Sequence, residues 1–253
     1  MGFNKEAYAA SRARVIERIK SSYDWENTTG FIADGVLRPE IFEQETLRVL
    51  CVLAESYDYE AGAIADLEKQ DARRKESDYF GLTNGKAKTS RLLATLLYPL
   101  LASRERGAKI TLAEWRELPN YIEITAENTA ILQNTLAKVA WVNVKKASNC
   151  SGSTRLNPML VAQHARMNKA ILQEQIEAIA ADLIMVFGQI TFEMMYELKL
   201  LGPKVQCGRI GQVQDTGEGP KILELSHPGS IRGWGYDGIY QKYEAICNQM
   251  GWF

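Results

Sequence analysis

The sequence predicts an α/β protein: a three-layer α/β/α sandwich with a central, mostly parallel four-stranded sheet. Four short apolar runs lie far apart along the 253 residues, and segments with helical periodicity separate them. Continuous apolar runs are typical of strands buried on both faces, and their alternation with helices is typical of βαβ units. The composition, 46% hydrophobic and 24% charged, is that of a globular chain and excludes intrinsic disorder.

The predicted strands are each rich in Val, Ile, Leu or aromatic residues, and each ends at a polar or glycine residue. They span residues 47–55, 139–145, 183–188 and 221–227. Helical periodicity predicts helices between and around them, beginning with residues 1–22, where Tyr8, Val15 and Ile19 recur at helical spacing. The other predicted helices span residues 40–45, 86–103, 126–138, 158–180, 189–201 and 236–250.

The chain shows no internal repeat and no low-complexity linker, so we expect a single domain over residues 1–253. Residues 1–36 would form an N-terminal helix and a segment that crosses the surface, because residues 23–39 are rich in turn formers. Residues 60–78, which include a charged run, would form an insertion.

Charge and cysteine usage narrow the class of protein. Thirty basic residues against 31 acidic ones exclude a uniformly basic nucleic-acid coat. The longest apolar run, residues 92–102, is shorter than the ~20 residues that span a bilayer, and the charged N-terminus is not a signal peptide. The four cysteines lie far apart, which predicts neither a disulfide framework nor a metal cluster. Because cysteines without disulfides are typical of a reducing compartment, we expect a cytoplasmic protein.

Ligands of open α/β sheets bind beyond the carboxyl ends of the strands. That rule selects residues 55–59, 143–146, 188–189 and 227–232. Two acids, an amide, lysines and one of the two histidines would therefore converge at one edge of the sheet.

These segments resemble motifs of the uracil-DNA glycosylase superfamily, over about residues 47–250. Residues 53–57 (LAESY) stand where the family has a first-strand motif such as GQDPY or GEAPG. Residues 141–146 (WVNVKK) are similar to its second-strand motif, and residues 227–231 (HPGSI) are similar to its HPSPL loop. Residues 79–81 (YFG) followed by 90–93 (SRLL) are a softer match to PFVGxAGxLL.

The resemblance implies a base-excision glycosylase that flips uracil or a related damaged base out of single- or double-stranded DNA and hydrolyses the N-glycosidic bond. It implies no metal and no organic cofactor. Glu55 would orient water or stabilise the cationic sugar, with Asp58 as the alternative carboxylate. His227 would donate to O2 of the departing base.

The resemblance also assigns the base pocket and the DNA contacts. Asn143 would read the edge of the base, Phe80 would stack on it, and Ser56 and Tyr57 would line the pocket. Ile231 would fill the gap left by the flipped nucleotide. The residues expected to contact DNA phosphates are Lys145, Lys146, Gly229, Ser230 and Arg232.

The charge pattern agrees with a DNA-binding face, because residues 81–104 and 138–173 carry basic side chains and no acid. The motifs also depart from the family. The opening glycine of its first motif is Leu53 or Ala54 here, its proline is Ser56 or Tyr57, and the cysteines that hold an iron–sulfur cluster in some branches are absent.

Two alternatives stay open at this point. The chain would be a catalytically inactive nucleic-acid-binding protein if Glu55, Asn143 and His227 serve only the fold. A serine-type hydrolase using Ser56 or Ser230 with His227 ranks lower, because the sequence lacks the Gly-x-Ser-x-Gly elbow.

Overall fold

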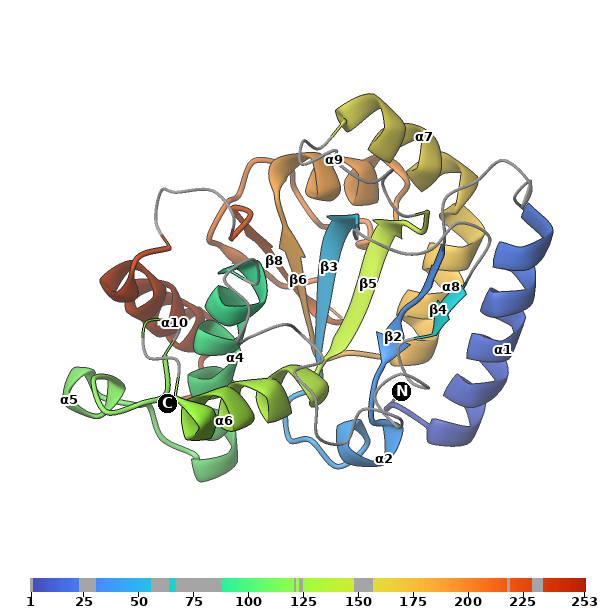
Figure 1. Ribbon diagram of the computed structural model, residues 1–253. Coiled ribbons are helices and arrows are strands. Elements are labelled where there is room, and N and C mark those ends of the chain that lie inside the picture. The colour runs from blue at the N-terminus through green and yellow to red at the C-terminus, as the bar shows by residue number, and fades with distance from the viewer. Residues whose placement is uncertain are drawn as a thin grey trace.

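The computed structural model of the protein describes residues 2–22, 31–55, 64–66, 88–120, 122, 125–147, 157–217, 219–228 and 234–253. The protein has the α/β class that the sequence predicts, with a mixed six-stranded sheet between helices (Figure 1). From one edge to the other, the strands are β2 (Gly35–Val36), β5 (Ala140–Lys145), β3 (Val49–Glu55), β6 (Leu183–Phe187), β8 (Lys221–Leu225) and β7 (Val213–Gln214).

The four central strands β5, β3, β6 and β8 run parallel and are the four that the sequence predicts. Cys51 on β3 pairs with Trp141 on one side and with Met185 on the other, which sets the register of the centre of the sheet. A sheet of only four strands was a wrong expectation, because β2 and β7 add antiparallel edges. Strands of two residues are too short to produce a periodic signal.

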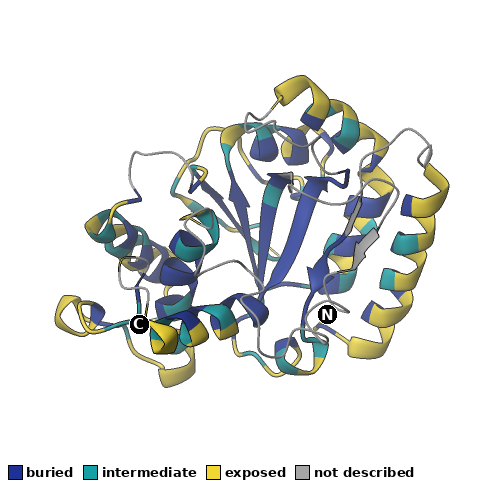
Figure 2. Ribbon diagram, viewed as in Figure 1, coloured by how far each residue is buried: buried dark blue, intermediate teal, exposed yellow. Residues whose placement is uncertain are grey.

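Helices cover both faces of the sheet (Figures 1 and 2). The β3–β5 connection supplies α4 (Lys88–Arg106), α5 (Leu112–Trp115) and α6 (Ala126–Ala137), and α10 (Tyr236–Met250) packs beside α4. On the other face lie α7 (Pro158–Met167), α8 (Lys169–Ile179) and α9 (Gln189–Glu197). Each face therefore buries its own apolar cluster against the sheet.

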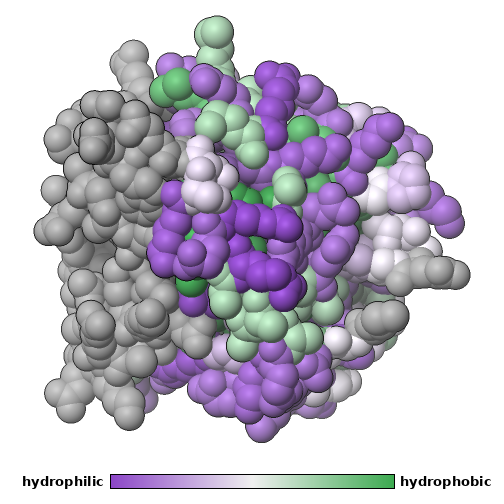
Figure 3. All heavy atoms as spheres, turned by 90° about the vertical axis from the view of Figure 1, so that its right-hand side faces the viewer, coloured by the Kyte–Doolittle hydropathy of each residue, from purple (hydrophilic) through white to green (hydrophobic). Residues whose placement is uncertain are grey.

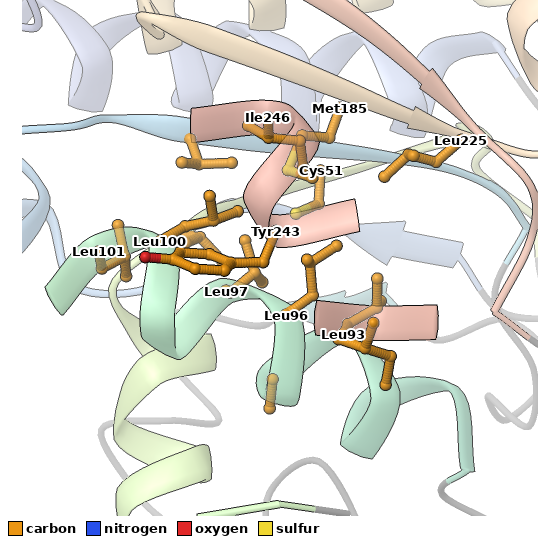
Figure 4. Close-up of a cluster of buried hydrophobic side chains, with 14 of the residues drawn as sticks. Cys51, Leu93, Leu96, Leu97, Leu100, Leu101, Met185, Leu225, Tyr243 and Ile246 are labelled. Carbon is orange, nitrogen blue, oxygen red and sulfur yellow. The ribbon is translucent and has the colours of Figure 1, made fainter. Parts of the chain in front are cut away.

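The cluster on the α4 face confirms the amphipathic pattern predicted for that helix. Leu92, Leu93, Leu96 and Leu97 are all buried. Figure 4 shows leucines of α4 facing Tyr243 of α10, with sheet residues such as Cys51 and Met185 nearby. Burying four leucine side chains removes the apolar stripe of α4 from water, at about 1.5–3 kcal/mol for each side chain.

The single helix predicted over residues 158–180 is divided in the structure. Asn168 ends α7 and precedes α8, with backbone angles of φ −90° and ψ 6°. Its side chain is buried, and Nδ2 donates to the carbonyl oxygen of Val144 at 3.3 Å. At this break the Asn168 amide forms a hydrogen bond with a carbonyl oxygen of β5. The sequence could not reveal the break, because the helical periodicity of the apolar residues continues through it.

The segment after α1 (Lys5–Ser22) was predicted to cross the surface, but part of it forms strands and is buried. β1 (Phe31–Ala33) pairs with β4 (Ile64–Asp66), β2 joins the main sheet, and residues 33–37 are buried. The backbone N–H of Val36 donates to Tyr8 Oη at 2.7 Å. Gly35 has φ +140°, and a Cβ there would overlap the Tyr8 hydroxyl, so this close approach requires glycine. A short helix, α2 (Pro39–Phe42), then leads to β3.

Helix α1 forms an outer layer on α8. Val15 and Ile19 pack with Ile171, and Arg14 and Arg18 form salt bridges with Glu174. The surface around α1 is mainly hydrophilic (Figure 3). Within the described ranges, no helix is long and apolar enough to cross a bilayer.

Candidate functional site

The carboxyl ends of the four parallel strands lie at one edge of the sheet (Figure 1). β5 lies on one side of β3, and the chain then crosses to β6 on the other side of β3. The strand order therefore reverses between β3 and β6, and such a switch point opens a crevice where α/β proteins bind ligands. This edge is the candidate site.

His227 lies at this edge, just beyond β8 and beside Gly188 at the end of β6. The N–H of Gly188 donates to the carbonyl oxygen of Leu225 at 2.7 Å, which holds the two strand ends together. Gly188 has φ +94°, and a Cβ on it would lie 3.6 Å from Cβ of His227. The β6–α9 turn and His227 are therefore direct neighbours.

The imidazole of His227 is suited to act as a neutral donor or acceptor. His227 is exposed to solvent on part of its surface. The protein around the rest of the ring desolvates it, which lowers the pKa of the imidazole from the model-peptide value of 6.5. The neutral form therefore dominates at pH 7. A neutral imidazole has one N–H to donate and one nitrogen that accepts.

A buried polar cluster lies at the end of β5, which we call the Asp34 cluster: Asp34, Asn143, Lys146 and Gln175. Oδ2 of Asp34 accepts from the backbone N–H of Asn143 at 2.5 Å and from its Nδ2 at 3.1 Å. Oδ1 accepts from Lys146 Nζ at 2.6 Å and from Gln175 Nε2 at 3.0 Å. The four hydrogen bonds satisfy both oxygens of the carboxylate.

Charge inside the Asp34 cluster is costly unless it is paired. Lys146 and Asp34 have side chains that are 0% exposed. Burial lowers the pKa of Lys146, while the Asp34 carboxylate acts in the opposite direction. The cluster therefore depends on its ion pair, and it joins the segment before β2 to β5 and α8.

Three of the residues predicted to contact substrate or DNA lie at the end of β5. Lys145 is 3% exposed and Lys146 is enclosed in the Asp34 cluster, so the prediction that they contact DNA phosphates is wrong for this structure. Asn143 is 5% exposed and its amide donates to Asp34. This hydrogen bond uses one of the two amide N–H groups and leaves the second N–H and Oδ1 for reading a base.

The remaining predicted residues lie outside the described part of the chain. They are Ser56, Tyr57, Asp58, Phe80, Gly229, Ser230, Ile231 and Arg232. For Glu55 the structure describes the backbone, which pairs with Lys145 at the carboxyl end of β3. Their proposed roles therefore stay predictions.

Two members of the Asp34 cluster were missed at the sequence level. Asp34 stands in a stretch rich in turn formers, where an aspartate is ordinary. Gln175 carried a signal, because it interrupts the apolar stripe formed by Ile171, Leu172 and Ile179 on α8. A polar residue in such a stripe needs a buried partner.

Within the described ranges, no group of three or more His, Cys, Asp or Glu side chains could hold a metal ion. Comparisons of the chain with models of known protein families and with curated protein sequences find no match.

Proposed function

We propose that the protein is a DNA glycosylase that flips uracil or a related damaged base out of DNA and hydrolyses its N-glycosidic bond. The observation that carries the proposal is the position of His227, beside Gly188 at the carboxyl edge of the parallel strands. This is the edge where the glycosylase-like motifs of the sequence were expected to converge. Extruding the base costs a few kcal/mol, which contacts in the base pocket must offset.

In this proposal His227 stabilises the leaving base. The bond to the sugar breaks with negative charge developing on the base, and an N–H aimed at O2 stabilises that charge. The role is open to the neutral imidazole that the lowered pKa favours, because this form keeps one N–H to donate. Glu55, at the end of the central strand β3, would stabilise the cationic sugar and orient the attacking water.

The proposal extends to the finer fold. We assign the parallel strands β5, β3, β6 and β8, with helices on both faces, to the core of a glycosylase-like three-layer sandwich. In that assignment β2, β7 and the outer helix α1 are additions at its periphery.

A second candidate function is nucleic-acid binding without catalysis. The Asp34 cluster favours it, because the amide expected to read the base is buried and hydrogen-bonded to a carboxylate. A chain that kept the fold and lost the base-reading role would have this arrangement.

The first experiment treats oligonucleotides that contain one uracil, single- and double-stranded, with the protein and then with alkali. The experiment compares wild type, Glu55→Gln and His227→Gln. A fourth protein, His164→Gln, controls for the loss of an imidazole, because His164 on α7 is the second of the two histidines in the sequence. Circular dichroism verifies that each variant is folded. We expect strand cleavage by wild type and His164→Gln, and loss of cleavage in the other two.

The other outcomes separate the alternatives. Cleavage that survives both Glu55→Gln and His227→Gln would overturn the site. Salt-sensitive DNA binding without cleavage of any damaged-base substrate would support the second candidate. Labelling of a serine by a fluorophosphonate would support a hydrolase instead.

A further inference from the structure

A large cavity lies at the opposite edge of the sheet from His227, under the amino ends of the strands. Its volume is about 1080 Å³. Arg48, Asp182 and Lys221 line it where β3, β6 and β8 begin, and Arg104 and Trp252 line it from the end of α4 and the C-terminal segment. Leu47, Ile176, Ile184, Leu201 and Met250 supply apolar walls.

We propose that this cavity binds a small phosphorylated ligand that carries a planar apolar group. The volume suits a molecule of nucleotide size, since small-molecule sites measure about 300–1,000 Å³. The inference does not rest on the proposed glycosylase activity, because none of the lining residues lies at the carboxyl edge.

The charge balance of the cavity favours an anion. Its ionisable lining groups are Arg48, Arg104, Lys204, Lys221, Glu45, Glu177 and Asp182. Arg48 is paired with Asp182 at 2.7 Å, and Glu45 is paired with Lys138, which lies outside the lining, at 3.2 Å. Three cations, Arg104, Lys204 and Lys221, are then opposed by Glu177 alone, and none of the three forms a salt bridge with a described carboxylate.

The Arg48–Asp182 pair makes the cavity rim rigid. Asp182 accepts from Nε of Arg48 at 3.0 Å, from its second guanidinium nitrogen at 2.7 Å and from its backbone N–H at 2.9 Å. The pair joins the starts of β3 and β6 in a bidentate geometry. This guanidinium is consequently part of the wall rather than a mobile ligand contact.

Two loops hold Lys204 at the cavity. Nζ of Lys204 lies 2.9 Å from the position that a Cβ on Gly217 would take, and Gly217 has φ +92°. The Thr216 methyl carbon lies 3.7 Å from the position that a Cβ on Gly202 would take. The Thr216 hydroxyl donates to the carbonyl oxygen of Pro220 at 2.9 Å. The absence of a side chain at residue 217 therefore allows the ammonium to lie against the loop that leads to Lys221.

Arg104 and Trp252 lie against each other on one side of the cavity, where the phosphate and the apolar part of the ligand would adjoin. The guanidinium carbon of Arg104 lies 5.7 Å from the centroid of the Trp252 ring. Stacking leaves the guanidinium N–H groups at its rim available to a phosphate. In the proposed complex the phosphate meets Arg104, Lys204 and Lys221, and the rest of the ligand meets Trp252 and Leu201, all of which line the same cavity.

Isothermal titration calorimetry tests the proposal, with ADP, inorganic pyrophosphate and adenosine as probes. We expect wild type to bind ADP with 1:1 stoichiometry, pyrophosphate more weakly and adenosine more weakly still. Lys204→Gln and Lys221→Gln should each weaken ADP binding by about tenfold, because each removes a charge-assisted hydrogen bond. Lys169→Gln, which removes an exposed lysine of α8 outside the cavity, should bind ADP like wild type.

Trp252→Leu separates the two halves of the proposal. It should weaken ADP binding and leave pyrophosphate binding unchanged. No binding of ADP or pyrophosphate to wild type would overturn the proposal, as would equal affinity for ADP and adenosine. Wild-type affinity in the double variant Lys204→Gln/Lys221→Gln would also overturn it. Calorimetry requires no glycosylase activity, so the two proposals fail independently.

Discussion

Lys146 Nζ lies 2.6 Å from Asp34 Oδ1, and neither side chain is exposed. The pair joins a residue that precedes the edge strand β2 to one that follows β5. Asn143 and Gln175 donate to the same carboxylate, so an N-terminal segment, a central strand and α8 meet at one anion. The geometry of the carboxyl edge beside the candidate site depends on this anion.

Removing the Asp34 charge should strongly destabilise the protein. Asp34→Asn leaves the Lys146 ammonium buried without its counter-charge, and we expect a loss of about 3–5 kcal/mol in the free energy of unfolding. Urea denaturation followed by circular dichroism measures it. Arg166→Gln, which breaks an exposed ion pair with Glu197, is the control and should cost about 1 kcal/mol or less.

The double variant Asp34→Asn/Lys146→Met checks the reason for that loss. It keeps a side-chain oxygen that can accept from Asn143 and Gln175 and removes the unpaired ammonium, so it should be more stable than Asp34→Asn. If the double variant is as unstable as Asp34→Asn, the ion pair is not the cause.

The sequence predicted the parallel core because each of its strands is a continuous apolar run. It could not predict the Asp34 cluster, whose hydrogen bonds join residues 109 to 141 positions apart in a turn-rich segment, a strand and a helix. The break at Asn168 was hidden for a similar reason. Its partner is the carbonyl oxygen of Val144, and no local pattern records that contact.

The candidate site, like the fold, could be predicted from the sequence only in part. The rule that ligands bind at carboxyl strand ends selected His227, and the structure places this histidine beside the end of β6. Lys145 and Lys146 were expected to contact DNA phosphates because they lie beside a predicted site loop in the acid-free basic window of residues 138–173. The structure buries Lys146 under Asp34, a residue from the segment that the sequence placed on the surface.

Tyr243 provides a test of the α4–α10 packing. Its Oη accepts from the backbone N–H of Ile110 at 2.6 Å and lies 2.6 Å from Ser103 Oγ, with the ring fully buried. Tyr243→Phe leaves these buried groups unsatisfied and should cost about 1–3 kcal/mol. Tyr240→Phe is the control, because no described residue forms a hydrogen bond with the Tyr240 hydroxyl. Equal losses in the two variants would contradict this explanation.

The alkaline stability should also depend on Tyr243. Burial raises its pKa from 10.0 to about 12. The folded state therefore retains the phenol proton longer than the unfolded state does, and the stabilisation is present below pH 10 and lost as pH rises toward 12. Urea denaturation over this range should show a smaller alkaline loss in Tyr243→Phe than in wild type. An identical pH dependence in the two proteins would show that the phenol does not contribute.

Three glycines with positive φ should respond differently to alanine. Gly35→Ala should be the most destabilising, because the new Cβ meets the Tyr8 hydroxyl at φ +140°. Gly188→Ala, with φ +94° and no atom closer than 3.6 Å, should cost about 1–3 kcal/mol from backbone strain. Gly107→Ala, at φ +68° in open space, should cost about 1–2 kcal/mol. Urea denaturation gives the order, and equal losses would show that the Tyr8 contact adds nothing.

The protonation of His227 provides the most direct test of the candidate site. The sequence has only two histidines, so His227→Gln assigns the imidazole signals in an NMR pH titration. Desolvation disfavours the imidazolium, and we expect His227 to titrate below 6.5. Its contribution to stability is then present above pH 6.5 and lost as pH falls toward the folded-state pKa. Protonation alone should not abolish glycosylase activity in this range, because both the imidazole and the imidazolium have an N–H to donate to the leaving base. Titration of His227 above 6.5 would show that a neighbouring negative charge outweighs desolvation, and His227 would then act as a cation at the carboxyl edge.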